Sequence, residues 1–187
     1  MVAIPALWLP ILLSAVIVFI ASSLVHMVFT YHRTDYAKLP NEDQVLNGLR
    51  SANIPPGEYL FPHAGSPAAM KSPEIQEKFQ KGPVGFLTLV PSGRPMMPKF
   101  FVQWFAYCVV VGVFAAYVAG RTLTPGAGYL PVFRIVGTVT FLAHSGAQPI
   151  WSIWRGQRWS VTFKACFDGL LFGLLTAGTF GWLWPKM

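Results

Sequence analysis

Charged side chains are scarce in this sequence. The chain has 187 residues, of which 11% are charged, and only seven are acidic. A soluble domain carries about 25% charged residues, so the composition argues against an ordinary water-soluble enzyme. A hydrophobic content of 53% and a mean hydropathy of +0.48 also exclude a disordered chain. The composition therefore predicts a membrane protein.

Cysteine is also scarce, and the familiar catalytic motifs are missing. Cys108 and Cys166 lie inside apolar runs and form no CxxC pair, so the sequence offers no disulfide framework. It contains no GxSxG, Walker or GxGxxG motif. Asp168 has no second acid inside an apolar run, as an aspartyl protease would need. The sequence therefore names no reaction, and whether the chain is an enzyme stays open.

Long apolar runs dominate what is present. A helix of about 20 apolar residues crosses a bilayer, and four runs qualify: residues 9–30, 100–120, 130–151 and 163–184. The first lacks a positively charged start and a small-residue cleavage site, so we expect a retained span rather than a signal peptide. Short turns between the last three predict antiparallel neighbours. The predicted fold is an all-α integral membrane protein, a four-transmembrane-helix bundle.

A polar insert separates the first two transmembrane helices. The predicted parts are transmembrane helix 1 (1–30), a membrane-associated insert (31–99), and transmembrane helices 2–4 (100–187). The insert holds all the acids but one: Asp35, Glu42, Asp43, Glu58, Glu74 and Glu77. We expect it to lie on the membrane ends of the helices, because it is poor in the aliphatic residues of an independent core.

Local signals predict three elements inside the insert. One helix is predicted over residues 41–52, with Asn41 as its cap. A second is predicted over residues 73–81, with Ser72 at the N-cap and Pro73 at the first helical position. Residues 84–90 are predicted to be extended.

The basic residues predict an orientation. The net charge is +7, which in so apolar a chain favours contact with anionic lipid headgroups rather than nucleic acid. Most bases fall on the side of the insert, which the positive-inside rule makes cytoplasmic. We therefore expect a bacterial inner membrane protein with both termini outside.

Small residues recur at every fourth position in two spans. Each series forms one stripe along a helix, and such stripes let helices pack closely in lipid. They predict close packing against neighbouring helices or a partner subunit. The members are Cys108, Gly112, Ala116 and Gly120 in the second span, and Gly169, Gly173, Ala177 and Gly181 in the fourth.

Polar residues of the spans gather at one depth, near the insert. Polar groups in lipid face the bundle interior and pair, and three interpretations follow. In the first, the layer is structural, with Asp168 paired to Lys164, Arg155 or Arg158. In the second, it is a pocket for a lipid headgroup or small ligand. In the third, two histidines hold a metal or a haem b iron. The candidate ligand-binding residues are His26, Gln103, His144, Gln148 and Asp168, and the candidate cofactor ligands are His26 and His144.

The other histidines lie in the insert. His32 and Asp35 have helical spacing, and His63 follows further on. No HExxH motif and no third partner at ligand spacing accompanies them. We therefore interpret them as solvated or capping residues, and no metal ligand is assigned.

The leading functional hypothesis is a non-enzymatic scaffold or accessory subunit of a larger membrane complex. Its expected partners are the lipid bilayer and other membrane subunits, or a second copy of the chain. The alternative is a cofactor- or ligand-binding membrane protein that uses the polar layer, including a bis-histidine haem.

Overall fold

The computed structural model describes residues 1–186 and divides the chain into two compact units. The helical unit combines residues 1–35 with the chain from residue 96 onward, and the insert unit is residues 36–95. The sequence interpretation ends the first helical part at residue 30. The structure keeps Tyr31–Asp35 with the helices, because Lys164 of the last helix hydrogen-bonds to Tyr31 and Asp35.

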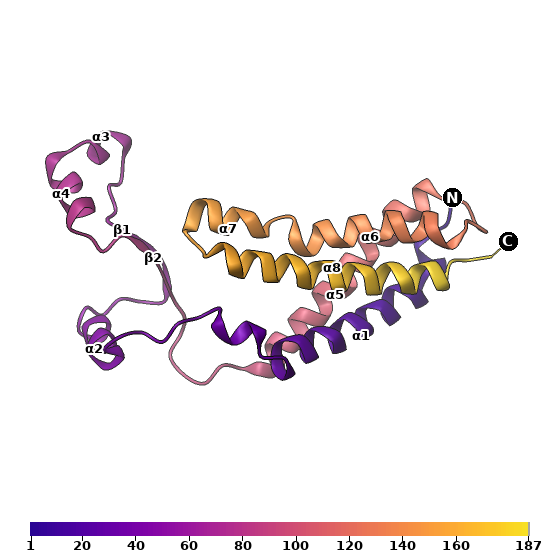
Figure 1. Cartoon of the computed structure of the whole chain (residues 1–187), viewed down its shortest axis with the longest axis horizontal. Coiled ribbons are helices and arrows are strands. Elements are labelled where there is room, and N and C mark those ends of the chain that lie inside the picture. The colour runs from indigo at the N-terminus through magenta and orange to yellow at the C-terminus, as the bar shows by residue number, and fades with distance from the viewer. Residues whose placement is uncertain (187) are drawn as a thin grey trace. The chain divides into compact units, whose positions relative to one another are not determined.

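Four helices of the helical unit are long and apolar enough to cross a membrane, as the sequence predicts (Figure 1). They cover Ile4–Val28, Met97–Thr122, Tyr129–Arg155 and Trp159–Trp182. The first contains α1 (Trp8–Ser23) between a 3-10 turn (Ile4–Leu7) and a π turn (Leu24–Val28). The others are α5 (Met97–Thr122), α6 (Tyr129–Ser145) with α7 (Gln148–Arg155), and α8 (Trp159–Trp182).

The third span is interrupted, which hydropathy does not reveal. Gly146 and Ala147 separate α6 from α7, and Pro149 lies in the first turn of α7. Proline lacks the amide hydrogen that continues a helix, and its ring clashes with the carbonyl four residues earlier. A new helix therefore begins at Gln148.

Both small-residue stripes pack inside the helical unit. On α5, a Cβ atom at Gly112 would lie 3.3 Å from the Ile11 side chain of α1. On α8, a Cβ atom at Gly173 would lie 3.2 Å from the backbone nitrogen of Phe141 in α6. The predicted close packing is therefore present, and neighbouring helices of the same chain provide it.

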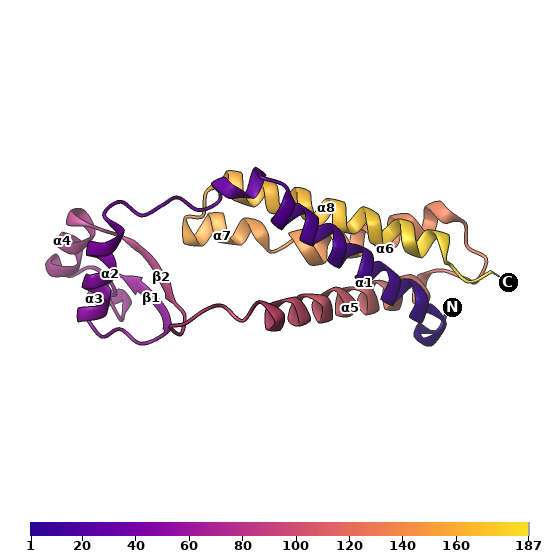
Figure 2. The ribbon, with the colours of Figure 1, turned by 90° about the horizontal axis from the view of Figure 1, so that it is seen from below.

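The apolar core of the helical unit includes side chains from all four spans. Both chain ends lie at one end of this unit in both views (Figures 1 and 2). Val2, near the N-terminus, donates its backbone amide to Gly120 near the end of α5. Trp184, just after α8, donates its indole NH to the carbonyl of Thr124. The core residues include Leu7, Ala115, Ala119, Val132, Val136, Ala177 and Phe180.

The insert unit contains the two predicted helices and a small sheet. α2 is Glu42–Ser51, and α4 is Pro73–Lys81 with the Ser72 hydroxyl accepting from the amide of Ile75. The predicted extended stretch forms β2 (Gly85–Leu89), which pairs antiparallel with β1 (Gly57–Phe61). The short helix α3 (Pro67–Met70) completes the unit. The chain is thus mostly helical rather than all-α.

No residue of 36–95, all of which are described, is buried. The strands are only partly covered: their residues alternate between half-buried and exposed. Local hydrogen bonds and caps therefore define this unit more than a core does.

Candidate functional site

Asp168 is the only acid in a span, and it is the centre of a polar network. Its relative exposure is 4%. The next residue, Gly169, allows α8 to lie close to α6, because a Cβ atom there would overlap the Ser145 hydroxyl oxygen. The close approach of the two helices buries the Asp168 carboxylate. A buried carboxylate needs hydrogen bonds or charges around it.

The segment Tyr31–Thr34 supplies these partners. The chain leaves the π turn at Val28, and residues 31–34 form a 3-10 turn that lies against α8. The Tyr31 hydroxyl donates to Asp168 Oδ1, and His32 Nε2 lies 2.9 Å from Asp168 Oδ2. His32 Nδ1 lies 2.6 Å from Asp35 Oδ2. One imidazole thus bridges two carboxylates.

Lys164 of α8 and Arg158 at the N-cap of this helix hydrogen-bond to the same segment. Lys164 Nζ lies 2.7 Å from Asp35 Oδ1 and 2.8 Å from the Thr34 hydroxyl. Arg158 donates to the backbone carbonyl of Asp35 at 2.9 Å. The structural interpretation named Lys164, Arg155 or Arg158 as the partner of Asp168. Lys164 pairs with Asp35 instead, and Tyr31 and His32 contact the carboxylate of Asp168.

The network shifts the acidity of two groups outside the spans. Burial opposes ionisation of Asp35, but hydrogen bonds from Lys164 and His32 outweigh it and hold the pKa of Asp35 below its usual range. Burial and the hydrogen bond to Asp168 raise the pKa of Tyr31. Asp35 is therefore a carboxylate and Tyr31 a hydroxyl donor at neutral pH.

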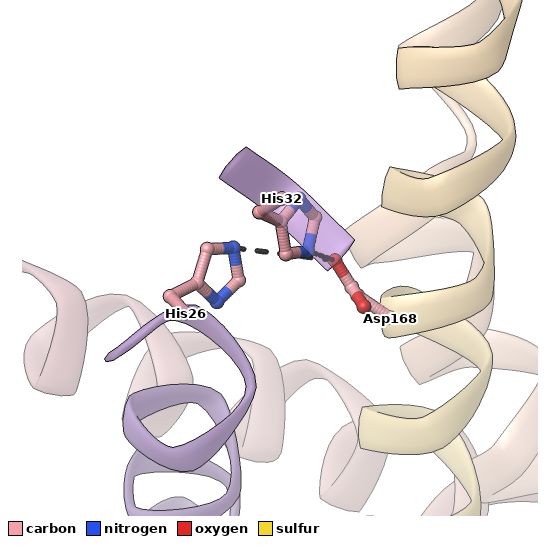
Figure 3. Close-up of side chains that lie close together, drawn as sticks. All are labelled: His26, His32 and Asp168. Atoms are coloured by element: carbon pink, nitrogen blue, oxygen red, sulfur yellow. Dashed lines mark hydrogen bonds and ion pairs between the residues drawn. The ribbon is translucent and has the colours of Figure 1, made fainter. Parts of the chain in front are cut away.

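His26 joins the network from the end of the first span. Its Nδ1 lies 3.0 Å from the carbonyl oxygen of Ser22, and its Nε2 lies 4.0 Å from Asp168 Oδ2. Its ring stacks on His32, with centroids 4.4 Å apart and planes 9° from parallel. Figure 3 shows His26, His32 and Asp168 together. Asp168 and the two histidines thus come from three separate elements.

A cavity of about 420 Å³ opens beside Asp168, with walls from all four spans. Trp104 and Tyr107 of α5 and Phe172 of α8 enclose the His144 ring, with centroid separations of 5.5 to 5.9 Å. Trp104 Nε1 also donates to the Ser22 hydroxyl at 2.7 Å. Hydrogen bonds and ring contacts therefore hold the walls in place.

The structure brings four of the five candidate residues together. His26, His144, Gln148 and Asp168 line the cavity. Gln103 does not line it and is exposed on α5. Because the helix turns about 100° per residue, a neighbour of the cavity-lining Trp104 points elsewhere.

His26 and His144 line the same cavity, and the bis-histidine haem stays a prediction. A bis-histidine haem needs a nitrogen of each imidazole on the same metal. His26 Nε2 lies 4.0 Å from Asp168 Oδ2, and His26, His32 and Asp168 form one group of three side chains that could hold a metal ion.

His32 and Asp35 belong to the network, although the sequence interpretation sets them aside. Their side chains are only 15% and 9% exposed, so they are not solvated. Their helical spacing was the one available signal. The third partner, which the local sequence does not contain, is Asp168, and it lies 136 residues from His32.

Comparisons with protein-family models, with curated proteins and with solved structures found no match. What the protein does must therefore be inferred from the chemistry of the site.

Proposed function

We propose that this chain is an integral membrane protein that binds a small ligand in the cavity between its four spans. The observation that carries the proposal is the lining of that cavity, where Asp168, His26, His144 and Gln148 meet among apolar walls. Polar side chains are costly inside a membrane and mark functional sites. The volume of about 420 Å³ lies within the usual range for small-molecule pockets, about 300–1,000 Å³.

Two of these polar groups are available to a ligand. Among the described residues, no hydrogen bond involves the His144 ring or the Gln148 amide, and no buried side-chain nitrogen or oxygen lacks a partner. Their polar atoms are therefore accessible, and both residues line the cavity. The surrounding rings of Trp104, Tyr107 and Phe172 suit a flat, mainly apolar molecule. The ligand that fits best is a lipid-soluble ring compound with one or two hydrogen-bonding oxygens.

Native mass spectrometry from lipid nanodiscs tests this proposal. Wild-type protein should carry a small molecule, and Gln148→Leu should weaken the affinity for it about tenfold and so lower the fraction of chains that carry it, since one hydrogen bond is worth about 1.4 kcal/mol here. Gln103→Leu is the matched control, because it makes the same change outside the cavity. An equal loss in both variants, or no bound molecule in the wild type, would reject the proposal.

The accessory-subunit role is the alternative proposal. The small-residue stripes suggested it, but they are covered by helices of the same chain and so do not support an interface. The same spectra distinguish it, since a subunit of a complex should appear with a second chain rather than with a small molecule.

The membrane and orientation are proposed on charge alone. Arg155 ends α7 and Arg158 precedes α8, and the insert adds most of the remaining bases. The positive-inside rule then makes the insert cytoplasmic and both termini external in a bacterial inner membrane.

A further inference from the structure

Three side chains with metal-binding atoms converge beside the cavity. They are His26 at the end of the first span, His32 in the following turn, and Asp168 in α8 (Figure 3). One ligand atom from each lies within 4.8 Å of the other two. His32 does not line the cavity, whereas His26 and Asp168 do.

In each of these three side chains, a second nitrogen or oxygen atom contacts another group of the protein. His26 Nδ1 lies 3.0 Å from the Ser22 carbonyl oxygen, which only accepts, so Nδ1 carries the hydrogen and Nε2 offers a lone pair. His32 Nδ1 lies 2.6 Å from Asp35 Oδ2, which orients that ring in the same manner. The Tyr31 hydroxyl donates to Asp168 Oδ1, leaving Oδ2 toward the histidines.

We propose that His26 Nε2, His32 Nε2 and the Asp168 carboxylate bind one divalent transition-metal ion, and that this ion is zinc. Two imidazoles and a carboxylate are a ligand set of catalytic zinc sites, and partners of the Asp35 and Ser22 kind orient such ligands. In a tetrahedral site with bonds of about 2.1 Å, ligand atoms lie about 3.4 Å apart. The separations from Asp168 Oδ2 to His32 and His26 are 2.9 and 4.0 Å, on either side of that value.

The charges around the three ligands suit a cation. Lys164 lies 2.7 Å from Asp35 and so balances the charge of that carboxylate. The ion would replace the contact between His32 Nε2 and Asp168 Oδ2, and Asp168 would be the single negative ligand beside the two imidazoles. A zinc ion would leave one net positive charge, which an oxygen ligand of the cavity can reduce.

The cavity also supplies the fourth coordination position. Since His26 and Asp168 form part of its wall, water or an oxygen of the bound molecule can reach the ion from that side. Only this fourth ligand rests on the proposed function. The three protein ligands stand independently of what occupies the cavity.

The test is zinc titration of the purified full-length chain in nanodiscs after removal of metal by a chelator. Calorimetry and elemental analysis should find one zinc per chain. His32→Ala should weaken zinc binding at least about 100-fold, because it removes one ligand of the ion together with the contact to Asp35 that orients this ligand. His63→Ala is the matched control: it removes an exposed histidine of the insert unit, outside both the cavity and the proposed site, and should bind zinc like the wild type.

A second variant covers the case in which His32→Ala does not fold. The His26 side chain is 52% exposed, so His26→Ala should fold normally and still bind zinc at least about tenfold more weakly. Wild-type affinity in His26→Ala, or equal weakening in His63→Ala, would overturn the site. Absence of zinc binding by the wild type would also overturn it and leave His32 as a bridge between two carboxylates.

The two proposals fail separately. Gln148→Leu should lose the cavity ligand and keep zinc, whereas His32→Ala should lose zinc. A wild-type chain that carries a small molecule but binds no zinc would reject the metal site alone.

Discussion

The helical unit and the insert unit hold their charged groups in different ways. In the helical unit, Lys164 and Asp35 lie 2.7 Å apart and their side chains are 23% and 9% exposed. In the insert unit, Lys78 and Glu74 lie 2.6 Å apart, but their side chains are 56% and 76% exposed. The first pair joins two elements, and the second joins successive turns of α4. The two ion pairs have similar distances but should contribute unequally to stability, because water screens the exposed pair.

The two units also differ in how tightly their side chains pack. Helices of the helical unit approach so closely that a single Cβ atom has little room at Gly173. In the insert unit no described residue is buried. Substitutions should therefore have large effects in the first unit and small effects in the second.

The largest effect is expected from Gly173→Leu. The Cβ atom alone would lie 3.2 Å from the Phe141 nitrogen and 3.4 Å from the Gly137 oxygen, both backbone atoms of α6. The rest of the leucine side chain fits only if α6 and α8 separate, and overpacking of this kind costs about 1–3 kcal/mol or more. Thermal unfolding in detergent should show a large loss of stability.

Gly178→Ala on the same helix is the control for this prediction. Its Cβ atom would lie 3.5 Å from the Tyr129 hydroxyl, an ordinary contact. Alanine also favours a helix over glycine by about 1 kcal/mol. If Gly173→Leu unfolds like Gly178→Ala, the tight packing of α6 on α8 is not important for stability.

An intermediate effect is expected from Lys164→Met. This change removes the donor to Asp35, to the Thr34 hydroxyl and to the Tyr31 carbonyl while keeping an apolar stem. Hydrogen bonds to charged groups contribute about 1.5–3 kcal/mol, so amide hydrogen exchange in residues 31–35 should accelerate about tenfold or more.

The exposed Lys186 provides the comparison, since Lys186→Met changes the same charge after α8. In Lys186→Met, amide hydrogen exchange in residues 31–35 should be unchanged. Equal acceleration in the two variants would mean that net charge, rather than the contact with Asp35, holds the segment.

The smallest effect is expected from Glu74→Gln in the insert unit. The hydrogen bond and charge of Lys78 hold the pKa of Glu74 below its usual range. A lowered folded-state pKa stabilises the fold above the unfolded-state pKa, and this contribution disappears as the pH falls through the folded value. At neutral pH we expect no measurable change in Tm, because the pair is exposed. A clear destabilisation that salt does not weaken would show that α4 depends on this pair.

Much of the fold was predictable because its signals are local. Apolar length alone located the four spans, and the Ser72 cap with Pro73 located α4. The break between α6 and α7 was not predicted, because average hydropathy does not register the local effect of Pro149. The strand β1 was also missed, since a strand needs a partner and its partner β2 lies beyond two helices.

The site was predictable only in part. Helix depth placed His26, His144, Gln148 and Asp168 in one layer, and all four line the same cavity. Depth does not specify the direction in which a side chain points. Gln103 was therefore included among the candidate ligand-binding residues, although it does not line the cavity. His32 was set aside because no HExxH motif and no third partner at ligand spacing accompanied it and Asp35.

The sequence by itself determined the apolar lengths, the Ser72 cap of α4, the uneven charge and the depth of the polar layer. Each depends on residues within a few turns of one another. Only the tertiary structure decided that the turn after the first span lies against α8, where His32 contacts Asp168, 136 residues away. The physical reason is that this contact depends on how α1 and α8 pack and on Gly169, whose missing side chain lets α8 approach α6. Helix packing therefore determines where the polar groups meet.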